Sequence, residues 1–333
     1  MAPSRTRVLT AVLLITGSCV LAGGPAYSAQ PKAPRVNEVD VPLTFALIGD
    51  TPYGDEQRTQ FPALLDEIND DPRVNMVLHA GDIKNGSSTC DDARFRDLYD
   101  LYETFRDPFV LTPGDNEWTD CHRVAAGRYL PTERLVALRD LFYAQPTRTL
   151  GVREMPVVSQ GTDGTQSEHQ EYVENVRFAR AGVVFATAHI VGSENDLAPW
   201  TDLAGGDRPE ERLAEFAARR AANLDWIGRT FDRAEAQDAA GVLLMMQAEP
   251  VQSPGFAAER ELIVERAAEF GRPVLLVHGD EHVFEVERQY AGVPNLTRLE
   301  TFGDTAMNWL RVTVDPSTED VFDWSPRTVG DGS

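Results

Sequence analysis

Lysine is almost absent from this chain of 333 residues. Among its 31 basic residues only Lys32 and Lys84 are lysines, and the others are arginines. Acidic residues number 53, which leaves a formal net charge of −22. So acidic a chain is repelled by phosphate backbones and by anionic lipid. We therefore expect neither nucleic acid nor an anionic membrane surface as its partner.

Long apolar runs are lacking as well. The stretch from Val8 to Leu21 is apolar but too short to span a bilayer, so we expect no transmembrane segment in the mature chain. It follows two arginines and precedes a run of small residues. That pattern is typical of a secretory signal peptide over residues 1–29, cleaved after Ser28 or Ala29. The sequence therefore predicts a secreted or extracytoplasmic protein.

Cysteine is scarce, with three residues. A lipid anchor at Cys19 is the lesser alternative to secretion, because residues 16–19 (TGSC) lack the usual aliphatic residue three positions before the cysteine. Signal cleavage leaves Cys90 and Cys121, an even number in an oxidising compartment, which predicts a disulfide between them. Closing that loop would stabilise the fold by about 3–4 kcal/mol. The alternative is two separate buried thiols.

The composition is that of a globular protein. Hydrophobic residues make up 42 % of the chain and charged residues 25 %, which suits one large domain or two small ones. Residues 30–41 are polar and contain proline, which indicates a linker. We place one domain over residues 42–326 and a flexible tail over residues 327–333.

Strand-like and helix-like patterns alternate along that domain. The expected strands are 43–48, 74–79, 109–112, 242–246 and 274–277, and the expected helices are 57–69, 91–105, 131–143, 209–236 and 257–270. This alternation predicts parallel pairing and an α/β fold in which two sheets form a sandwich. Residues 151–172 indicate a surface excursion, 175–190 a hairpin that turns at Ala181-Gly182, and short strands after residue 283 an antiparallel finish.

Four apolar runs each end in Gly-Asp, which places an aspartate directly after a predicted strand. They are FALIGD ending at Asp50, MVLHAGD ending at Asp82, FVLTPGD ending at Asp115 and VLLVHGD ending at Asp280. One such pair is typical of a turn. Four carboxylates at one sheet edge repel one another unless a cation lies between them. Together the four runs predict a metal centre.

The order of these motifs resembles the calcineurin-like metallophosphoesterase family, whose series is D-x-H, G-D-x-x-[D/N], G-N-H-[D/E], a lone histidine after a strand, and G-H-x-H. The resemblance extends from Leu43 to Val314. It implies a four-layer αββα sandwich of two mixed β-sheets flanked by helices. It also implies hydrolysis of a small phosphate-ester substrate by metal-activated water.

The second motif is intact, because Gly81-Asp82-Ile83-Lys84-Asn85 matches it in full. In the family this aspartate bridges two metal ions, so the resemblance assigns that role to Asp82. Asp50 stands at the first motif as a ligand of one ion, although Pro52 occupies the place of the histidine. His282 ends the last motif as the family pattern requires.

The remaining positions depart from the family. Asp115 stands in place of the ligand asparagine and Asn116 in place of the histidine, although a register shifted by one residue would make Asn116 the ligand. Asp280 replaces the first histidine of the last motif, and residues 244–250 contain no histidine. The resemblance therefore implies this set of metal ligands: Asp50, Asp82, Asp115, Asp280 and His282. Carboxylates with one imidazole suit one or two hard divalent cations, with Mn, Mg or Ca favoured over Zn or Fe.

The replacements also affect catalysis, for which Asn116 and His282 are the expected residues. Asn116 occupies the place of the family's proton donor and can donate a hydrogen bond but no proton near neutral pH. We therefore expect weak catalysis or a need for good leaving groups. His122 and His278 are candidate substitute acids, whereas His79 is expected to be a core histidine.

Substrate binding is assigned to the segment after Asp82. Lys84 is expected to neutralise a phosphate oxygen as a point charge, and Asn85 to contact the substrate beside it. The alternative function is a catalytically weak or silent binding protein on the cell exterior that keeps the same fold.

Overall fold

The computed structural model describes residues 42–164, 167–304 and 306–330. These residues lie within a compact unit that spans positions 35–333. The predicted signal peptide, the linker up to residue 41 and the alternative anchor at Cys19 lie outside the described residues. Among the helices described, none combines the length and the apolar character needed to cross a membrane.

The first sheet has the strand order β12-β11-β1-β2-β3. Its parallel part consists of β1 (Leu43–Ile48), β2 (Val74–His79) and β3 (Phe109–Leu111), and its antiparallel part of β11 (Trp309–Val314) and β12 (Phe322–Arg327). Helix α1 (Gly54–Asp70) connects β1 to β2, and α2 (Asp92–Tyr102) connects β2 to β3. Helix α3 (Pro131–Phe142) follows β3 and precedes the second sheet.

The second sheet has the strand order β4-β5-β6-β7-β8-β10-β9. Its parallel centre consists of β6 (Val183–Thr187), β7 (Gly241–Met245), β8 (Val274–His278) and β10 (Leu296–Glu300). The antiparallel edges are β4 (Val158–Ser159), β5 (Val176–Arg180) and β9 (Glu285–Arg288). Helices α5 (Pro209–Ala236) and α6 (Ala257–Phe270) belong to this half. Short helical turns are α4 (Gly192–Asn195), η1 (Thr119–His122), η2 (Ser167–His169) and η3 (Tyr290–Gly292).

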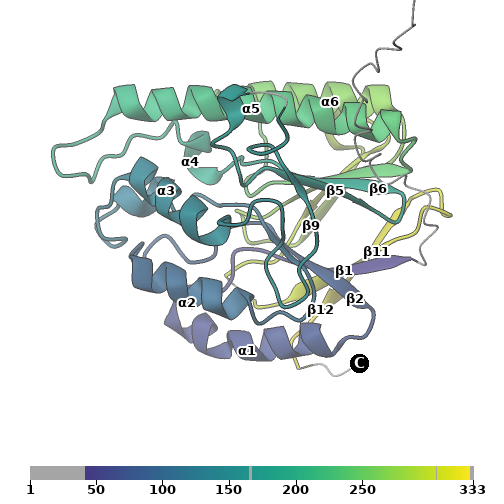
Figure 1. Ribbon diagram of the computed structural model, residues 1–333, viewed down its shortest axis with the longest axis horizontal. Helices are drawn as coiled ribbons and strands as arrows, with labels where there is room; N and C mark the ends of the chain where they lie inside the picture. Colours follow the sequence, from purple (N-terminus) through teal and green to yellow (C-terminus); the bar gives the residue numbers. More distant parts are fainter. Residues whose placement is uncertain (1–41, 165–166, 305, 331–333) are drawn as a thin grey trace, which may run out of the picture. The chain divides into compact units, whose positions relative to one another are not determined.

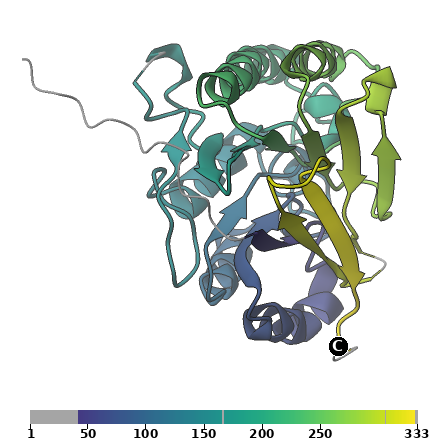
Figure 2. The ribbon, with the colours of Figure 1, turned by 90° about the vertical axis from the view of Figure 1, so that its right-hand side faces the viewer.

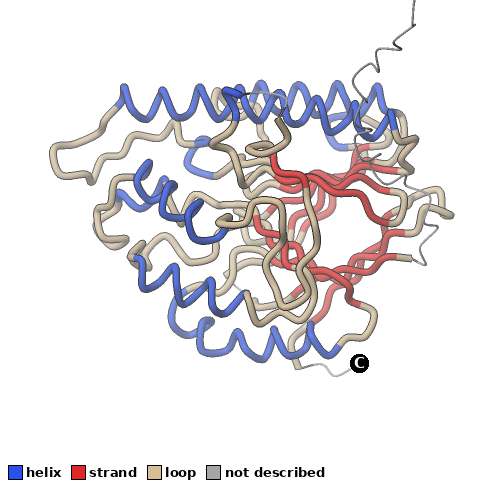
Figure 3. The backbone as a smooth tube through the Cα atoms, in the orientation of Figure 1, coloured by secondary structure: helices blue, strands red, loops and turns tan. Residues whose placement is uncertain are grey.

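The two sheets lie between two helical layers, with α5 and α6 on one side and α1 and α2 on the other (Figures 1 and 3). A view turned by 90° shows the strands of both sheets stacked between the helices (Figure 2). Side chains alternate along β1 accordingly. Phe45 and Leu47 pack in the core between the sheets, whereas Ala46 and Ile48 pack toward the helices. The four-layer αββα sandwich is therefore confirmed.

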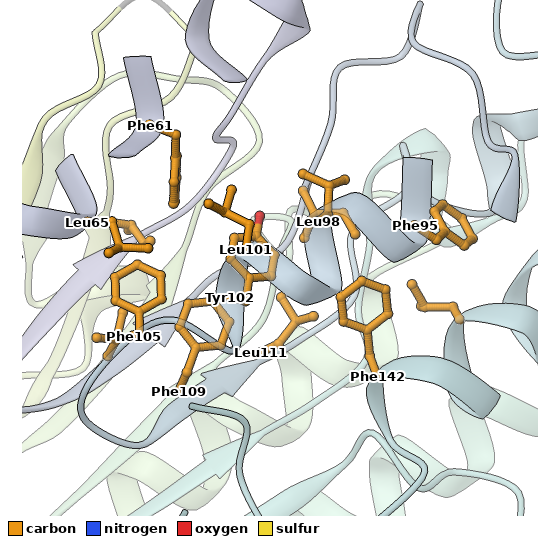
Figure 4. Close-up of a cluster of buried hydrophobic side chains, with 14 of the residues drawn as sticks. Phe61, Leu65, Phe95, Leu98, Leu101, Tyr102, Phe105, Phe109, Leu111 and Phe142 are labelled. Carbon is orange, nitrogen blue, oxygen red and sulfur yellow. The ribbon is translucent and has the colours of Figure 1, made fainter. Parts of the chain in front are cut away.

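The helical layer on the first sheet is held by a cluster rich in aromatic residues (Figure 4). Phe95, Leu98 and Tyr102 recur along α2 at helical spacing and so form its buried face. The ring of Tyr102 stacks on that of Phe109 in β3 with 4.7 Å between centroids. Asp91 caps the helix by accepting a hydrogen bond from the Arg94 backbone N–H at 2.8 Å. This packing fixes the ends of β2 and β3, from which the site is built.

Most predicted elements agree with the structure to within three residues at each end, and three details differ. The segment 151–172 is more than a surface excursion, because β4 within it joins the second sheet. The expected antiparallel finish is divided between the sheets, and β10 pairs in parallel with β8. The last strand continues to Arg327, one residue into the expected tail. The hairpin at Ala181-Gly182 is confirmed, with both residues at positive φ.

The predicted disulfide between Cys90 and Cys121 is confirmed, with a Cα–Cα distance of 5.8 Å. It joins the segment that follows β2 to η1, which follows β3. Both sulfurs are buried within the helix-facing cluster of the first sheet. The bridge therefore ties together the two segments that carry Asp82 and Asp115.

Candidate metal centre

The four predicted aspartates follow the carboxyl ends of parallel strands. Asp50, Asp82 and Asp115 come after β1, β2 and β3, and Asp280 comes after β8 of the other sheet. Ligand sites of α/β proteins lie at this edge. The convergence that the metal hypothesis requires is therefore present in the fold.

The backbone at these positions is unusual. Asp50, Asp82, Asp280 and His282 have φ values of 51°, 57°, 84° and 64°, in the left-handed region that few residues other than glycine adopt. Such conformations are retained where the surrounding structure requires them, and they cluster at functional sites. In this protein they turn side chains from two sheets toward one point.

The glycine of a Gly-Asp pair makes room for the aspartate of another pair. A Cβ atom on Gly279 would lie 2.0 Å from Asp50 Oδ2, and one on Gly114 would lie 2.0 Å from Asp82 Oδ1. A Cβ on Gly192, which begins α4, would lie 2.7 Å from both Asp115 Oδ2 and Asp280 Oδ1. These glycines are therefore required by the close approach of the carboxylates.

The described residues contain two groups of side chains that could each hold a metal ion, and both groups include Asp82. The first group, which we name the histidine half, consists of Asp50, Asp82 and His282. The second, which we name the aspartate half, consists of Asp82, Asp115 and Asp280. In each group the ligand atoms lie within 4.8 Å of one another. Asp82 is thus the one carboxylate that belongs to both groups.

The electrostatics favour a bound cation. Burial, followed by repulsion from Asp115, raises the pKa of Asp82 well above its usual value. Burial with repulsion from Asp115 and Asp50 raises the pKa of Asp280 to about 8. Within the described ranges, His282 is the one basic side chain within 4.0 Å of these four aspartates, and it lies 3.5 Å from Asp50 Oδ1. Four crowded carboxylates whose negative charge is balanced by so few basic side chains would be stabilised by a divalent cation. Carboxylate oxygens and one imidazole nitrogen are also suitable ligands for such an ion.

Asn116 lies beside the shared aspartate. Its backbone N–H donates to Asp82 Oδ1 at 3.1 Å, and its side-chain amide donates to Asp82 Oδ2 at 2.5 Å. Asp115 belongs to the aspartate half, whereas the Asn116 side chain presents its N–H group to Asp82. Glu117 Oε1 accepts hydrogen bonds from the backbone of Asp82 and Gly114, and it thereby links the second motif to the third.

Lys84 and Asn85 differ in what their side chains offer. Lys84 is buried, and burial lowers the pKa of its ammonium to about 8 against the attraction of Glu117 and Asp82. Its Nζ donates to the backbone oxygen of Asn85 at 3.3 Å. The side-chain oxygen of Asn85 accepts four hydrogen bonds from Ser87 and Ser88. That oxygen therefore stabilises its own loop, so the expected substrate contact of Asn85 would have to come from its side-chain N–H group.

The candidate substitute acids are unsuited to donate a proton near neutral pH. His278 is buried between the Gly279 carbonyl and Arg298, and burial lowers its pKa to about 3. Burial also lowers the pKa of His122, whose Nδ1 faces the backbone N–H of Asp202 at 3.4 Å. His79 is a satisfied core histidine, with Nε2 2.9 Å from the Thr51 carbonyl.

Sequence reasoning did not assign three polar residues that the fold brings to the site. Gln247 donates to Asp280 Oδ1 at 2.7 Å and accepts from the Gly192 N–H at 2.7 Å. Ser193 Oγ lies 3.0 Å from Asp115 Oδ2. The third, Tyr53, donates to Asp82 Oδ2 at 2.5 Å. Gln247 was recognisable, since it follows β7 where the family places its lone histidine, but Ser193 carries no sequence signal.

Comparison with known proteins gives one family. A family model described as calcineurin-like phosphoesterase matches residues 43–284. No curated protein matches the chain. Among solved structures, the chain is similar to GAP50, the anchor in the inner membrane complex of Plasmodium, at 13 % identity and a TM-score of 0.44, with 88 % of this chain and 90 % of that chain covered. It is also similar to the calcineurin-like phosphoesterase YfkN from Bacillus subtilis, at 11 % identity and a TM-score of 0.38, with 87 % and 92 % covered.

Proposed function

The chain belongs to the calcineurin-like phosphoesterase family, and we propose that it is a metal-dependent hydrolase of phosphate esters. The observation that carries this proposal is the membership of Asp82 in both ligand groups. One shared carboxylate can hold two cations at the separation that phosphoryl-transfer sites use. We expect Mn, Mg or Ca at the centre, because four of its five ligands are carboxylates.

Ions held by the two halves would supply a nucleophilic water and polarise a phosphoryl oxygen. The protein would contribute the position of the ester. His282 and Asp280 are the partly exposed members of the two halves, whereas Asp50, Asp82 and Asp115 are buried. The substrate phosphate therefore approaches from the side of His282 and Asp280.

Lys84 would neutralise substrate charge. Its ammonium is buried within the attraction of Glu117 and Asp82, and its hydrogen bond to the Asn85 carbonyl leaves further N–H donors for a phosphate oxygen. In a chain with a net charge of −22, such a cation would offset the repulsion of an anionic ester. We assign Lys84 to phosphate binding, with Asn85 beside it as a second candidate through its side-chain N–H group.

Proton donation to the leaving group is the weak part of the site. Asn116 stands where a proton donor is expected, and it serves Asp82 as a hydrogen-bond donor. An amide cannot transfer a proton near neutral pH. The enzyme should therefore prefer esters with good leaving groups, such as activated aryl phosphates.

A direct test is turnover of activated aryl phosphate monoesters and diesters with Mn²⁺, Mg²⁺ or Ca²⁺. Asp82→Asn should abolish metal-dependent turnover, because it removes a ligand of both halves. Asp66→Asn, an exposed position in α1, is the matched control and should behave as wild type. Turnover that is absent from wild type, or unchanged in Asp82→Asn, would overturn the enzyme proposal.

The alternative is a binding protein of the same fold without useful catalysis. It is favoured by the replacement of the motif histidines with Asn116, Gln247 and Asp280. This alternative would be supported if wild type bound Mn²⁺ but hydrolysed neither phosphate monoesters nor diesters.

We further propose that the protein acts outside the cytoplasm, after removal of the signal peptide. The disulfide between Cys90 and Cys121 supports an oxidising compartment. The intact mass of the protein recovered from its native host should correspond to a chain that begins after Ser28 or Ala29. A mass that includes residues 1–28 would contradict cleavage, and added lipid on Cys19 would favour the anchor.

A further inference from the structure

Tyr53 places its phenol oxygen against every ligand of the histidine half. Its Oη lies 3.4 Å from Asp50 Oδ1, 2.5 Å from Asp82 Oδ2 and 3.3 Å from His282 Nε2. The residue is buried and comes three positions after Asp50. We propose that Tyr53 is a fourth protein ligand of the cation in the histidine half, through its phenol oxygen.

Two of these distances match the spacing of ligand atoms within one coordination shell. When metal–oxygen distances are about 2.1 Å, neighbouring ligand atoms lie about 3.0–3.4 Å apart, depending on coordination number. The distances to Asp50 Oδ1 and His282 Nε2, 3.4 and 3.3 Å, lie in this range, whereas the 2.5 Å to Asp82 Oδ2 is that of the hydrogen bond the phenol donates. The phenol oxygen thus lies where a fourth ligand atom would join those of Asp50, Asp82 and His282.

The surroundings hold Tyr53 in this position. The amide of Asn116 donates to its oxygen at 2.9 Å, and the ring of His282 packs against its ring edge to face, with 5.0 Å between centroids. His282 in turn directs Nδ1 toward Asp304 Oδ1 at 3.6 Å, which leaves Nε2 facing Tyr53 and Asp50. A carboxylate behind a ligating imidazole is the usual support for such a ligand.

The assignment also accounts for a gap in the first motif. Pro52 occupies the position of the family's histidine, and a proline side chain offers no donor atom. Tyr53, one residue further on, supplies an oxygen in the same half of the centre. The histidine half then has three oxygen donors and one nitrogen donor, which keeps the preference for hard cations.

This inference rests on the metal centre that the proposed function also requires, but its test does not depend on turnover. Mn²⁺ binding is measured by calorimetry on the full chain and on Tyr53→Phe, which removes only the hydroxyl. We expect the affinity of the histidine half to fall by at least about tenfold, the lower end of what losing even a supporting group costs. The aspartate half should keep its affinity.

The matched control is Tyr143→Phe, which removes another buried phenol hydroxyl, the donor to the Leu111 carbonyl at 3.1 Å. It should leave Mn²⁺ binding as in wild type. If Tyr53→Phe lowered the Mn²⁺ affinity of both halves equally, Tyr53 would only position Asp82. That result would overturn the assignment of Tyr53 as a ligand. So would a gain of affinity, which would mean that the phenol blocks the site.

Wild type alone provides a second readout if Tyr53→Phe does not fold. Mn²⁺ should produce a tyrosine difference absorption band that saturates with occupancy of the histidine half. No band at saturating Mn²⁺ would overturn the assignment. A band accompanied by no turnover of any ester would refute the hydrolase and leave the role of Tyr53 intact.

Discussion

The side-chain amide of Asn116 lies 2.5 Å from Asp82 Oδ2. A group that cannot transfer a proton is therefore in contact with the carboxylate shared by both halves of the metal centre. We predict that Asn116→His raises turnover about 10²-fold for esters with poor leaving groups and much less for activated aryl esters, because general acid catalysis helps most where the leaving group is basic.

The check is a comparison of turnover across alkyl and aryl phosphates in wild type and Asn116→His. Asn75→His, at an exposed position of β2, is the control and should leave both rates unchanged. Equal rates for Asn116→His and wild type on alkyl esters would show that the missing acid does not limit turnover.

A second prediction concerns the close approach that glycine permits. Gly279→Ala would place a Cβ 2.0 Å from Asp50 Oδ2, so one of the two must move. We expect a loss of about 1–3 kcal/mol in unfolding free energy, measured by urea titration, together with weaker Mn²⁺ binding.

Gly228→Ala in α5 is the opposite case, since nothing lies within 4 Å of a Cβ there. This control should gain about 0.5–1 kcal/mol, because alanine is the better helix former. Gly279→Ala with wild-type stability and wild-type Mn²⁺ affinity would contradict the packing described for Asp50.

A third prediction concerns acid stability. Burial alone would raise the pKa of Glu174. The guanidinium of Arg139 donates to its carboxylate at 2.6 and 3.0 Å, and Nδ1 of His189 lies 2.7 Å from it. These contacts outweigh burial and hold the pKa at about 2. A carboxyl whose pKa is lower in the folded state stabilises the fold above its unfolded value of about 4.5. That contribution, on the order of 3 kcal/mol, should vanish as the pH falls from about 4.5 to 2.

Urea unfolding between pH 2 and 7 checks this window. Glu174→Gln should be less stable than wild type at pH 7 and should lose less stability on acidification. Glu171→Gln removes an exposed carboxylate 3.7 Å from the same arginine and should change little. If the unfolding free energies of wild type and Glu174→Gln changed in parallel with pH, the stabilising role of the buried Glu174–Arg139 ion pair would be contradicted.

A fourth prediction concerns the disulfide. Cys90 and Cys121 are 31 positions apart, so the double variant Cys90→Ala/Cys121→Ala should lose about 3–4 kcal/mol of unfolding free energy. Reductant should lower the stability of wild type by a similar amount and leave the double variant unaffected. Equal loss on reduction in both proteins would point to a cause other than this bridge.

Much of this site was predictable from sequence, and the reason is geometric. An apolar run that ends in Gly-Asp reveals both the strand and the position of the carboxylate at its end, and parallel strands place their ends together. That reasoning anticipated Asp50, Asp82, Asp115 and Asp280 as neighbours. The helices were equally readable, because Phe95, Leu98 and Tyr102 show the helical period directly.

The remaining part depended on how the chain turns after each strand. Tyr53 enters the histidine half because Asp50 adopts a left-handed conformation and α1 begins at Gly54, and neither feature is visible in residue types. Ser193 reaches Asp115 from a turn in which it and the next three residues all have positive φ. Local backbone conformation, rather than residue pattern, decides such contacts.

In the proposed site Asp82 serves both halves of one metal centre. The shared ligand is tested by equilibrium binding of Mn²⁺ to wild type, Asp82→Asn and Asp115→Asn, each compared with the Asp66→Asn control. We predict that Asp82→Asn weakens every Mn²⁺ site of the chain, whereas Asp115→Asn weakens only the aspartate half. Wild-type Mn²⁺ binding by Asp82→Asn, or a loss confined to one half, would contradict the shared ligand.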